Sequence, residues 1–311
     1  MLTISRLDRI RLSARPRGQR LVAHLVLTPN YAALPGVHIA LEGQEHIPDE
    51  PVVFAMNHTD RFNYWPFQWK LWKAHDRFTA TWVKGKYYES PVVGRFMEST
   101  NNIPTVSRGY IIVRDFMNTL GRKPGDAEYR AARDWVDAVA HGRAIGDDAR
   151  ALPAAIVERG RDMLGRRFDP SRETYGEAVD ATFRHMMGQF IALNERAHRL
   201  GLDILLFPEG TRSKRLSRGR IGLAQIAFHL GVPVVPVGCS GSDHVYPTSS
   251  PFARSGRIVY RFGEPVRADA THPDAPPADF VPFDATSETQ NRARLQRFTD
   301  DVMERINALV D

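Results

Sequence analysis

Residues 202–213 read Leu-Asp-Ile-Leu-Leu-Phe-Pro-Glu-Gly-Thr-Arg-Ser, an apolar run that stops at a proline and a glycine. The apolar part is typical of a buried strand in a parallel sheet, and the turn after it carries Glu209, Thr211 and Arg212 at the strand's carboxyl end. Ligands bind at that end in open α/β sheets. A carboxylate and a guanidinium there can orient a hydroxyl group and hold a phosphate, because the guanidinium fork fits phosphate oxygens. A salt-bridged turn without a ligand is the alternative interpretation.

A second polar cluster lies upstream and also follows a short apolar run. Residues 52–56 have the composition of a buried strand, and Asn-His-Thr-Asp at 57–60 follows directly, in a loop or at a helix start. A histidine in such a place can serve as a general base, so His58 is the first candidate for a catalytic residue.

Similar runs along the chain predict a single α/β domain in which a mostly parallel sheet is flanked by helices. Strands are expected at 37–41, 52–56, 79–83, 202–207, 232–237 and 258–262. Amphipathic helices are expected at 181–200, before residue 230 and over the last residues of the chain. We expect the active site at the carboxyl ends of the strands, facing a membrane.

The composition favours an anionic partner. Lys and Arg total 42 against 36 for Asp and Glu, which gives a net charge of +6 and a pI near 9.6. Phospholipid headgroups and phosphorylated substrates fit this charge, whereas nucleic acid is not expected, because the basic residues are scattered among acidic ones and no nucleic-acid motif is recognised. The single cysteine, Cys239, rules out an internal disulfide and fits a reducing compartment. We interpret it as a buried core residue, because it follows an apolar run.

Residues 1–30 are expected to form a basic arm, because arginines alternate there with apolar residues. An arm lying on an anionic membrane surface, a transit peptide and a plain solvated arm are three interpretations of this pattern. A membrane-spanning helix is not expected, because no window of 18 apolar residues exists. The aromatic segment 62–72 would suit a membrane interface or an acyl chain, and core packing is its alternative.

The two polar clusters resemble the signature blocks of the glycerolipid acyltransferase family, the lysophosphatidate and glycerol-3-phosphate acyltransferases. Those blocks read Asn-His-x4-Asp and Phe-Pro-Glu-Gly-Thr-Arg-Ser, and residues 207–213 match the second at every position. The stretches 43–48, 102–108 and 231–237 also resemble parts of that family. The resemblance covers most of the chain apart from the N-terminal arm and a region at about 119–179. His58 and Glu209 are farther apart than is usual in the family, so that region is interpreted as a mostly helical insertion within an acyltransferase domain of residues 31–311.

The resemblance implies transfer of a fatty acyl group from acyl-CoA or acyl-ACP to a hydroxyl of a glycerol phosphate or lysophospholipid. The first choice of acceptor is 1-acylglycerol-3-phosphate, which would give phosphatidate. His58 would be the general base, Arg108 and Arg212 would hold the acceptor's phosphate, and Glu209 would fix the acceptor or the turn. The substrate-binding set is completed by Gly210, Thr211 and Arg220. No cofactor or metal is expected, and the protein is expected in the cytoplasm, peripheral on the inner face of the membrane, with acyl carrier protein as a further candidate partner.

One position departs from the family pattern. The family aspartate should lie five residues after His58, and this chain has Asn63 there. The carboxylate of a His-Asp pair fixes the imidazole tautomer and stabilises the imidazolium, whereas an asparagine oxygen can do only the first. Asp60 is near but points in a different direction from a residue five positions on. Three readings follow: a slower acyltransferase, a site rewired through Asp60, or a catalytically silent lipid-binding relative.

Overall fold

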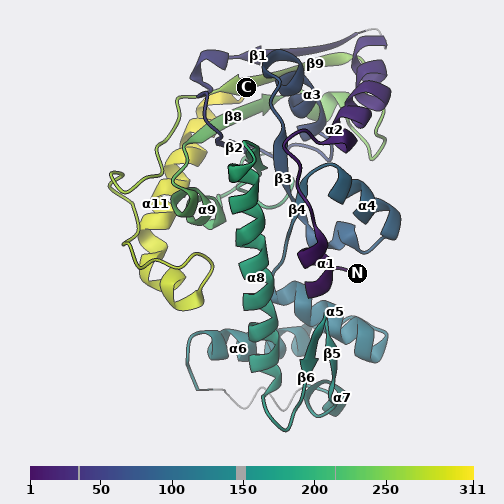
Figure 1. The fold of residues 1–311 in the computed structure, drawn as a ribbon, viewed down its shortest axis with the longest axis vertical. Coiled ribbons are helices and arrows are strands. Elements are labelled where there is room, and N and C mark those ends of the chain that lie inside the picture. Colours follow the sequence, from purple (N-terminus) through teal and green to yellow (C-terminus); the bar gives the residue numbers. More distant parts are fainter. Residues whose placement is uncertain (34–35, 145–151, 214) are drawn as a thin grey trace.

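The computed structural model describes residues 1–33, 36–144, 152–213 and 215–311. A seven-stranded sheet runs through the molecule in the order β1-β9-β8-β2-β7-β3-β4 (Figure 1). Its strands are β1 (Val37–Glu42), β2 (Val53–Met56), β3 (Thr79–Lys84), β4 (Asn102–Thr105), β7 (Asp203–Leu206), β8 (Val234–Ser240) and β9 (Gly256–Phe262). Strands β8, β2, β7, β3 and β4 are parallel, while β9 runs antiparallel to β8 and parallel to β1. The predicted α/β fold with a mostly parallel sheet is confirmed.

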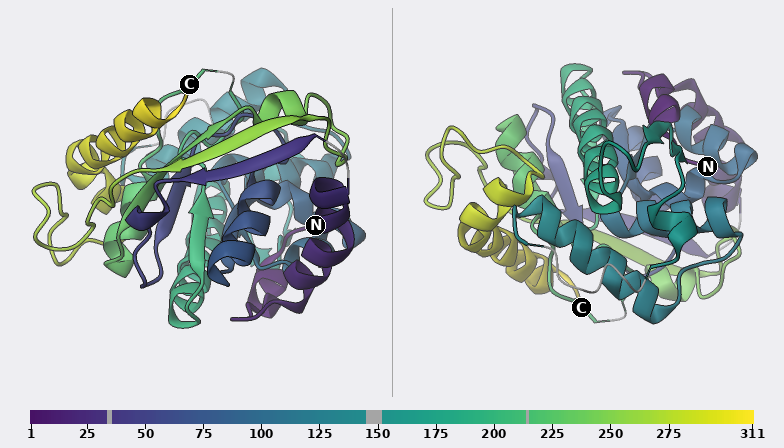
Figure 2. Two further views of the ribbon diagram at one scale, coloured as in Figure 1. Left: turned by 90° about the horizontal axis from the view of Figure 1, so that it is seen from above. Right: turned by 90° about the horizontal axis from the view of Figure 1, so that it is seen from below.

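Helices cover both faces of the sheet. Successive strand residues point to opposite faces, so each strand contributes to two core clusters. Val53 and Ala55 of β2 pack into one cluster together with α8 (Tyr175–Arg199), α9 (Gly222–Leu230) and α11 (Ala285–Leu309). Phe54 and Met56 pack into the other, together with α3 (Tyr64–His75) and residues 22–31. In both views of Figure 2 the N-terminal helices and α11 lie on opposite sides of the molecule. Strands β2 and β7 are therefore buried at every residue.

The region expected to be a helical insertion contains helices and one hairpin. It holds the end of α5 (Arg108–Leu120), α6 (Asp126–Ala140), α7 (Ala154–Val157), β5 (Arg161–Met163) and β6 (Arg166–Phe168). The region is not helical between Val157 and α8, because a tight turn at Leu164 and Gly165, both with positive φ, folds the chain into β5 and β6. Figure 1 shows these elements at the end of the molecule away from β1 and β9.

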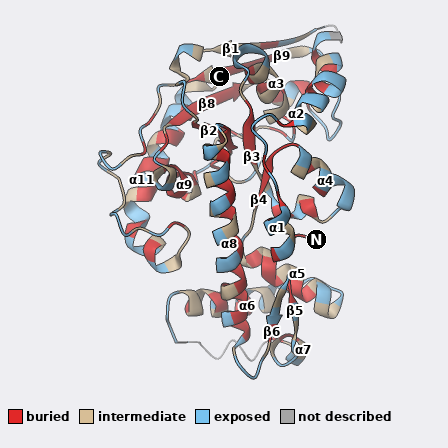
Figure 3. Cartoon of the chain, in the orientation of Figure 1, coloured by how far each residue is buried: buried red, intermediate tan, exposed pale blue. Residues whose placement is uncertain are grey.

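Helix α8 joins that end of the molecule to the sheet. Thr174 and Glu177 form a capping box at its start, so the helix begins before the end of the expected insertion and continues through the expected helix at 181–200. Its buried stripe is visible in Figure 3. The helix contacts α5 and α6 as well as β4 and β7, which explains how the two ends of the molecule share one core.

The first residues of the chain are part of the core. Helices α1 (Ile4–Arg9) and α2 (Arg17–Val22) begin the chain, and α1 packs against α8. The apolar side chains in and beside α1 are at most 7% exposed: Leu2, Ile4, Leu7, Ile10 and Leu12. Arg6 forms an ion pair with Glu98 at 2.8 Å. The interpretation in which these apolar residues lie on a membrane is therefore wrong. The sequence could not show this, because a buried core and a membrane face require the same alternation of apolar and polar residues.

In the described part of the chain, none of the helices combines the length and the apolarity that crossing a bilayer requires.

Candidate active site

The two polar clusters meet at the carboxyl ends of β2 and β7, which are neighbours in the sheet. The backbone N–H of His58 donates a hydrogen bond to Oε1 of Glu209 at 2.9 Å. In return, the backbone N–H of Ser213 donates to the carbonyl oxygen of His58, also at 2.9 Å. The loop after β2 and the turn after β7 are thus tied together directly.

Asn63 occupies the position next to the imidazole that the family gives to aspartate. Its Oδ1 lies 3.2 Å from Nδ1 of His58, and its Nδ2 donates to the carbonyl oxygen of Asn57 at 2.8 Å. Because a carbonyl can only accept, the amide of Asn63 must turn its oxygen to His58, and Nδ1 must then carry the proton. The hydroxyl of Tyr260 on β9 donates to the backbone oxygen of Asn63 at 2.5 Å. The tautomer with an unprotonated Nε2, which a general base needs, is therefore selected.

Asn57 anchors this loop to the strand on the other side. Its side chain donates to the carbonyl oxygen of Cys239 at 2.9 Å and accepts from the N–H of Cys239 at 2.7 Å. Cys239 is 1% exposed, which confirms that it is a core residue, and burial raises the pKa of its thiol well above the usual range. Both backbone groups of a buried strand end are thus satisfied by one side chain.

Asp60 serves the loop and does not replace the missing carboxylate. Its two oxygens accept from the backbone N–H of Phe62 at 2.7 Å and from the hydroxyl of Thr59 at 3.0 Å. Burial raises the pKa of Asp60. Among the described residues it makes no hydrogen bond to His58, so the rewired reading gains no support from the geometry.

Glu209 is buried and connects the loop after β2 to the segment that contains Ser217. It is 3% exposed, and its second oxygen accepts from both the N–H and the hydroxyl of Ser217 at 2.9 Å each. A carboxylate that accepts three such bonds is held rigidly. Of the two roles expected for Glu209, fixing the turn is the one that these contacts fit.

A group of cations lies beside His58. Arg212 and Arg220 are exposed in the segment after β7, and Lys84 is exposed at the end of β3. Gly210 has a φ of +69°, and a Cβ there would lie 2.8 Å from Nε of Arg220, so only glycine lets that side chain cross the turn. Thr211 is exposed in the same turn. Within the described ranges, Lys84, Arg212 and Arg220 form no ion pair, although Nε of Arg220 donates to the carbonyl oxygen of Glu209 at 3.3 Å.

Sequence reasoning missed Lys84. A lone lysine after a strand carries little signal, but β3 is the neighbour of β7, so its carboxyl end opens on the same edge of the sheet. Lys84 lies close enough to these arginines to interact with their charges. Burial and the cations Lys86, Arg220 and Arg212 lower the pKa of Lys84. We name Lys84, Arg212 and Arg220 the cationic cluster.

The electrostatics of His58 follow from these neighbours. Its ring stacks on Phe207, with 4.0 Å between centroids. Burial, the largest cause, lowers the pKa of His58, and the hydrogen bond to Asn63 opposes the shift, whereas Arg212 and Lys84 add to it. Together they bring the pKa to about 4. The imidazole is therefore neutral at pH 7, as a general base must be.

Arg108, the other arginine expected to bind phosphate, has a carboxylate partner. It is the first residue of α5, and its Nε and Nη2 donate to Oδ1 of Asp180 on α8 at 3.0 and 2.9 Å. Its guanidinium also lies 4.3 Å from the ring centroid of Phe183. These contacts fasten α5 to α8, so the phosphate-binding role of Arg108 stays a prediction that would require this pair to open.

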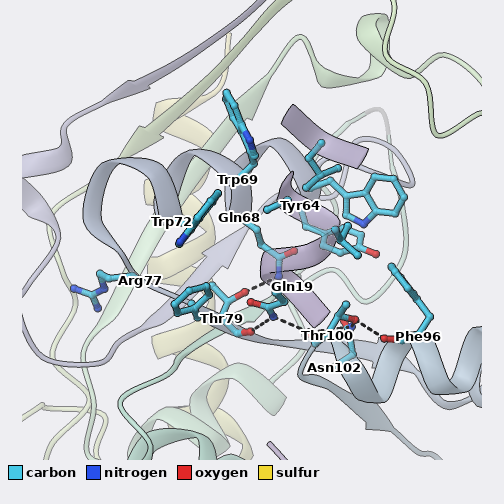
Figure 4. Close-up of a pocket in the computed structure, with 15 residues that line it drawn as sticks. Gln19, Tyr64, Gln68, Trp69, Trp72, Arg77, Thr79, Phe96, Thr100 and Asn102 are labelled. Carbon is cyan, nitrogen blue, oxygen red and sulfur yellow. Dashed lines mark hydrogen bonds between the residues drawn. The ribbon is translucent and has the colours of Figure 1, made fainter. Parts of the chain in front are cut away.

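An aromatic pocket begins next to the loop that carries His58, since Tyr64 and Trp65 directly follow Asn63. Its free volume, between α3 and residues 19–27, is about 30 Å³. In Figure 4, Gln19 closes its floor by hydrogen bonds to the carbonyl oxygens of Thr79 (2.8 Å) and Thr100 (2.6 Å). Trp69 and Trp72 line the wall, whereas Phe62 and Phe67 of the same aromatic segment are buried in the core, as its alternative interpretation held.

Two known proteins are similar to this chain. A 1-acyl-sn-glycerol-3-phosphate acyltransferase, BAT2 from the chloroplast of Brassica napus, is 46% identical over 52 residues, which are 16% of this chain and 15% of that protein. The solved structure of the 1-acyl-sn-glycerophosphate (LPA) acyltransferase PlsC from Thermotoga maritima is 16% identical over 97% of this chain and 87% of its own, with a TM-score of 0.40. The match to BAT2 thus spans only a small part of that relative.

The family match is much longer. The model of the Acyltransferase family matches residues 38–128 and 145–240, which are more than half of the chain and contain both polar clusters, Lys84 and Arg108. The residues that surround His58 therefore lie within the matched region, and the chain belongs to the Acyltransferase family.

Proposed function

We propose that this protein is an O-acyltransferase that moves a fatty acyl group from a thioester to a hydroxyl of a glycerol phosphate or lysophospholipid. The first choice of acceptor is 1-acylglycerol-3-phosphate, with phosphatidate as product. The observation that carries the proposal is the position of a neutral His58, with Nε2 available, beside a cationic cluster without carboxylate partners among the described residues. A base and an anion site side by side suit an acceptor that carries both a hydroxyl and a phosphate.

The reaction needs no covalent acyl-enzyme. Nε2 of His58 takes the proton of the acceptor hydroxyl while that oxygen forms a bond to the thioester carbonyl carbon. The tetrahedral intermediate then collapses, the carbon–sulfur bond breaks, and the leaving thiolate takes the proton from His58. The products are an ester and a free thiol, and His58 returns to its neutral form.

The cationic cluster would hold the acceptor's phosphate, with Arg212 supplying a planar fork and Lys84 a compact charge. The aromatic pocket beside α3 has a free volume of only about 30 Å³, so it would have to widen to admit an acyl chain. The thioester would be presented by coenzyme A or by acyl carrier protein.

The test is thiol release from long-chain acyl-CoA with 1-acylglycerol-3-phosphate as acceptor. We expect acceptor-dependent release that falls by about 10²–10⁴-fold in His58→Ala, which removes the general base. Circular dichroism should show the same fold in the variant. Equal activity in His58→Ala would refute the proposal.

A silent lipid-binding protein is the second candidate, because Asn63 brings no negative charge to the imidazole. That candidate requires lysophospholipid binding that depends on Arg212 and no thiol release with coenzyme A or carrier-protein thioesters. Acceptor-dependent release of either thiol would exclude it.

The proposed location is peripheral, on the inner face of the cytoplasmic membrane. Residues 21–26 carry three exposed apolar side chains, since Leu21, Leu25 and Val26 are 59%, 67% and 42% exposed. The exposed arginines 17 and 20 precede them, and such a pairing favours anionic lipid surfaces. Co-sedimentation with anionic vesicles should fall for Leu25→Asp. Val281→Asp, which changes a 55% exposed apolar residue just before α11, is the matched control and should bind normally.

A further inference from the structure

The carboxylates nearest to His58 are occupied elsewhere. Glu209 accepts from the backbone N–H of His58 and from Ser217, and Asp60 accepts from Phe62 and Thr59. In the described part of the molecule, Asn63 makes the only hydrogen bond to the imidazole ring, and it is neutral. The protein therefore offers no hydrogen-bonded anion to the imidazolium that forms when His58 accepts a proton.

The charged groups that act on the ring are both positive. Arg212 comes from the turn after β7, and Lys84 comes from the end of β3. Both disfavour the charged form of His58, as does burial, which is the largest cause of its lowered pKa. The unliganded site is thus poorly suited to holding an imidazolium, and a weak base abstracts a proton slowly.

These same two cations belong to the cluster that suits a phosphate. An anion bound to Arg212 and Lys84 would offset their two positive charges and so remove their bias against the imidazolium. We propose that the phosphate of the bound acceptor supplies the negative charge that stabilises the His58 imidazolium, in place of the carboxylate that Asn63 lacks. The inference rests on the proposed function and goes beyond it, because the headgroup then both positions the hydroxyl and strengthens the base.

The proton balance of the reaction is unchanged. The hydroxyl proton moves to Nε2 of His58 as the carbon–oxygen bond forms, and it moves on to the thiolate as the carbon–sulfur bond breaks. The phosphate keeps its own charge and covalent bonds throughout. It stabilises the short-lived imidazolium between these two transfers, as a buried aspartate does in a His-Asp pair.

A titration of His58 tests the electrostatic step without any turnover. The ring signals of histidine-labelled protein are followed by NMR, and that of His58 is assigned by its loss in His58→Gln. Titrations are compared in chloride, in sulfate and in glycerol 3-phosphate at equal ionic strength. Sulfate is included because its charge stays constant over the titration. We expect both anions to raise the pKa of His58 by about one unit or more, as an opposite charge nearby does.

Variants tie that shift to the cluster. The double variant Lys84→Ala/Arg212→Ala should lose the shift. Arg218→Ala should keep it, because Arg218 lies in the same segment but faces Asp300 at 3.8 Å. A pKa of His58 that stays constant while the anions bind, as seen by shifts of the Arg212 side-chain signals, would overturn the proposal. Absence of any anion binding would overturn it as well.

Kinetics provide a second, independent comparison. If the phosphate replaces the carboxylate, the two should be partly redundant. In the wild type, kcat should fall by about tenfold or more when a monoacylglycerol replaces 1-acylglycerol-3-phosphate at saturation, and Asn63→Asp should reduce that loss. Equal losses in both proteins would contradict the proposal. If no acceptor is turned over, the acyltransferase function fails, while the NMR result still decides whether an anion controls His58.

Discussion

The two ends of strand β7 carry the same residue types in opposite arrangements. At its amino end, buried Asp203 is paired with Arg77 and also accepts from the backbone N–H of Val52 at 3.0 Å. At its carboxyl end, Glu209 is used by backbone groups and Ser217, and Arg212 forms no ion pair in the described ranges. A carboxylate and an arginine that satisfy each other hold the fold, whereas an arginine without such a partner is available to a ligand.

The largest effect is expected at the amino end. Arg77→Ala would leave Asp203, which is 1% exposed, without its counter-ion, and burial already raises the pKa of that carboxyl. Breaking such a buried pair typically costs about 3–5 kcal/mol. Urea denaturation should show that loss in the free energy of unfolding, while activity per folded molecule should stay close to that of the wild type. A stable but inactive variant would contradict the contrast between the two ends.

Arg212→Ala should show the reverse pattern. Its side chain is exposed and pairs with no described carboxylate, so stability should change by no more than about 0.5 kcal/mol. The catalytic efficiency should fall by about 10–100-fold, which corresponds to the loss of a hydrogen bond between charged groups. Initial rates over a range of acceptor concentrations measure this, and Arg218→Ala is the matched control. A large fall in melting temperature would place Arg212 with the structural arginines.

Arg108 tests, at a site outside β7, whether an arginine with a carboxylate partner serves the fold and not the ligand. Sequence resemblance gives it the same role as Arg212, yet it is paired with Asp180 at 2.9 Å. Because Asp180 also pairs with Arg184, at 3.0 Å, Arg108→Ala leaves that carboxylate partly satisfied. We therefore expect a loss of about 1–2 kcal/mol in stability. A rise in the acceptor's KM as large as that of Arg212→Ala would show that the pair opens for the phosphate.

The contrast also explains what could be predicted from the sequence. Apolar runs that end in polar residues located β2 and β7 and placed His58 and Glu209 at one edge of the sheet, because parallel strands share an edge. The sequence could not say whether Arg108 or Arg212 has a carboxylate partner, since Asp180 is 72 residues from Arg108. For the same reason, the apolar residues of α1 could not be assigned to the core, and Lys84 could not be assigned to the site.

The smallest effect concerns pH and separates His58 from an ordinary surface histidine. A general base works in its neutral form, so activity is lost as pH falls through its pKa. Burial lowers that pKa from 6.5 to about 4, so kcat/KM with a monoacylglycerol, an acceptor that does not itself titrate, should stay constant from pH 7 down to about 5. In Asn63→Asp the carboxylate favours the imidazolium, so the acidic limb should move upward by about one unit or more. Profiles of the two proteins measured in the same buffers give this shift directly. An acidic limb with a pKa near 6.5 in the wild type would mean that the imidazole is exposed to water when the acceptor binds. The contrast between a buried His58 and the exposed cations around it would then be wrong.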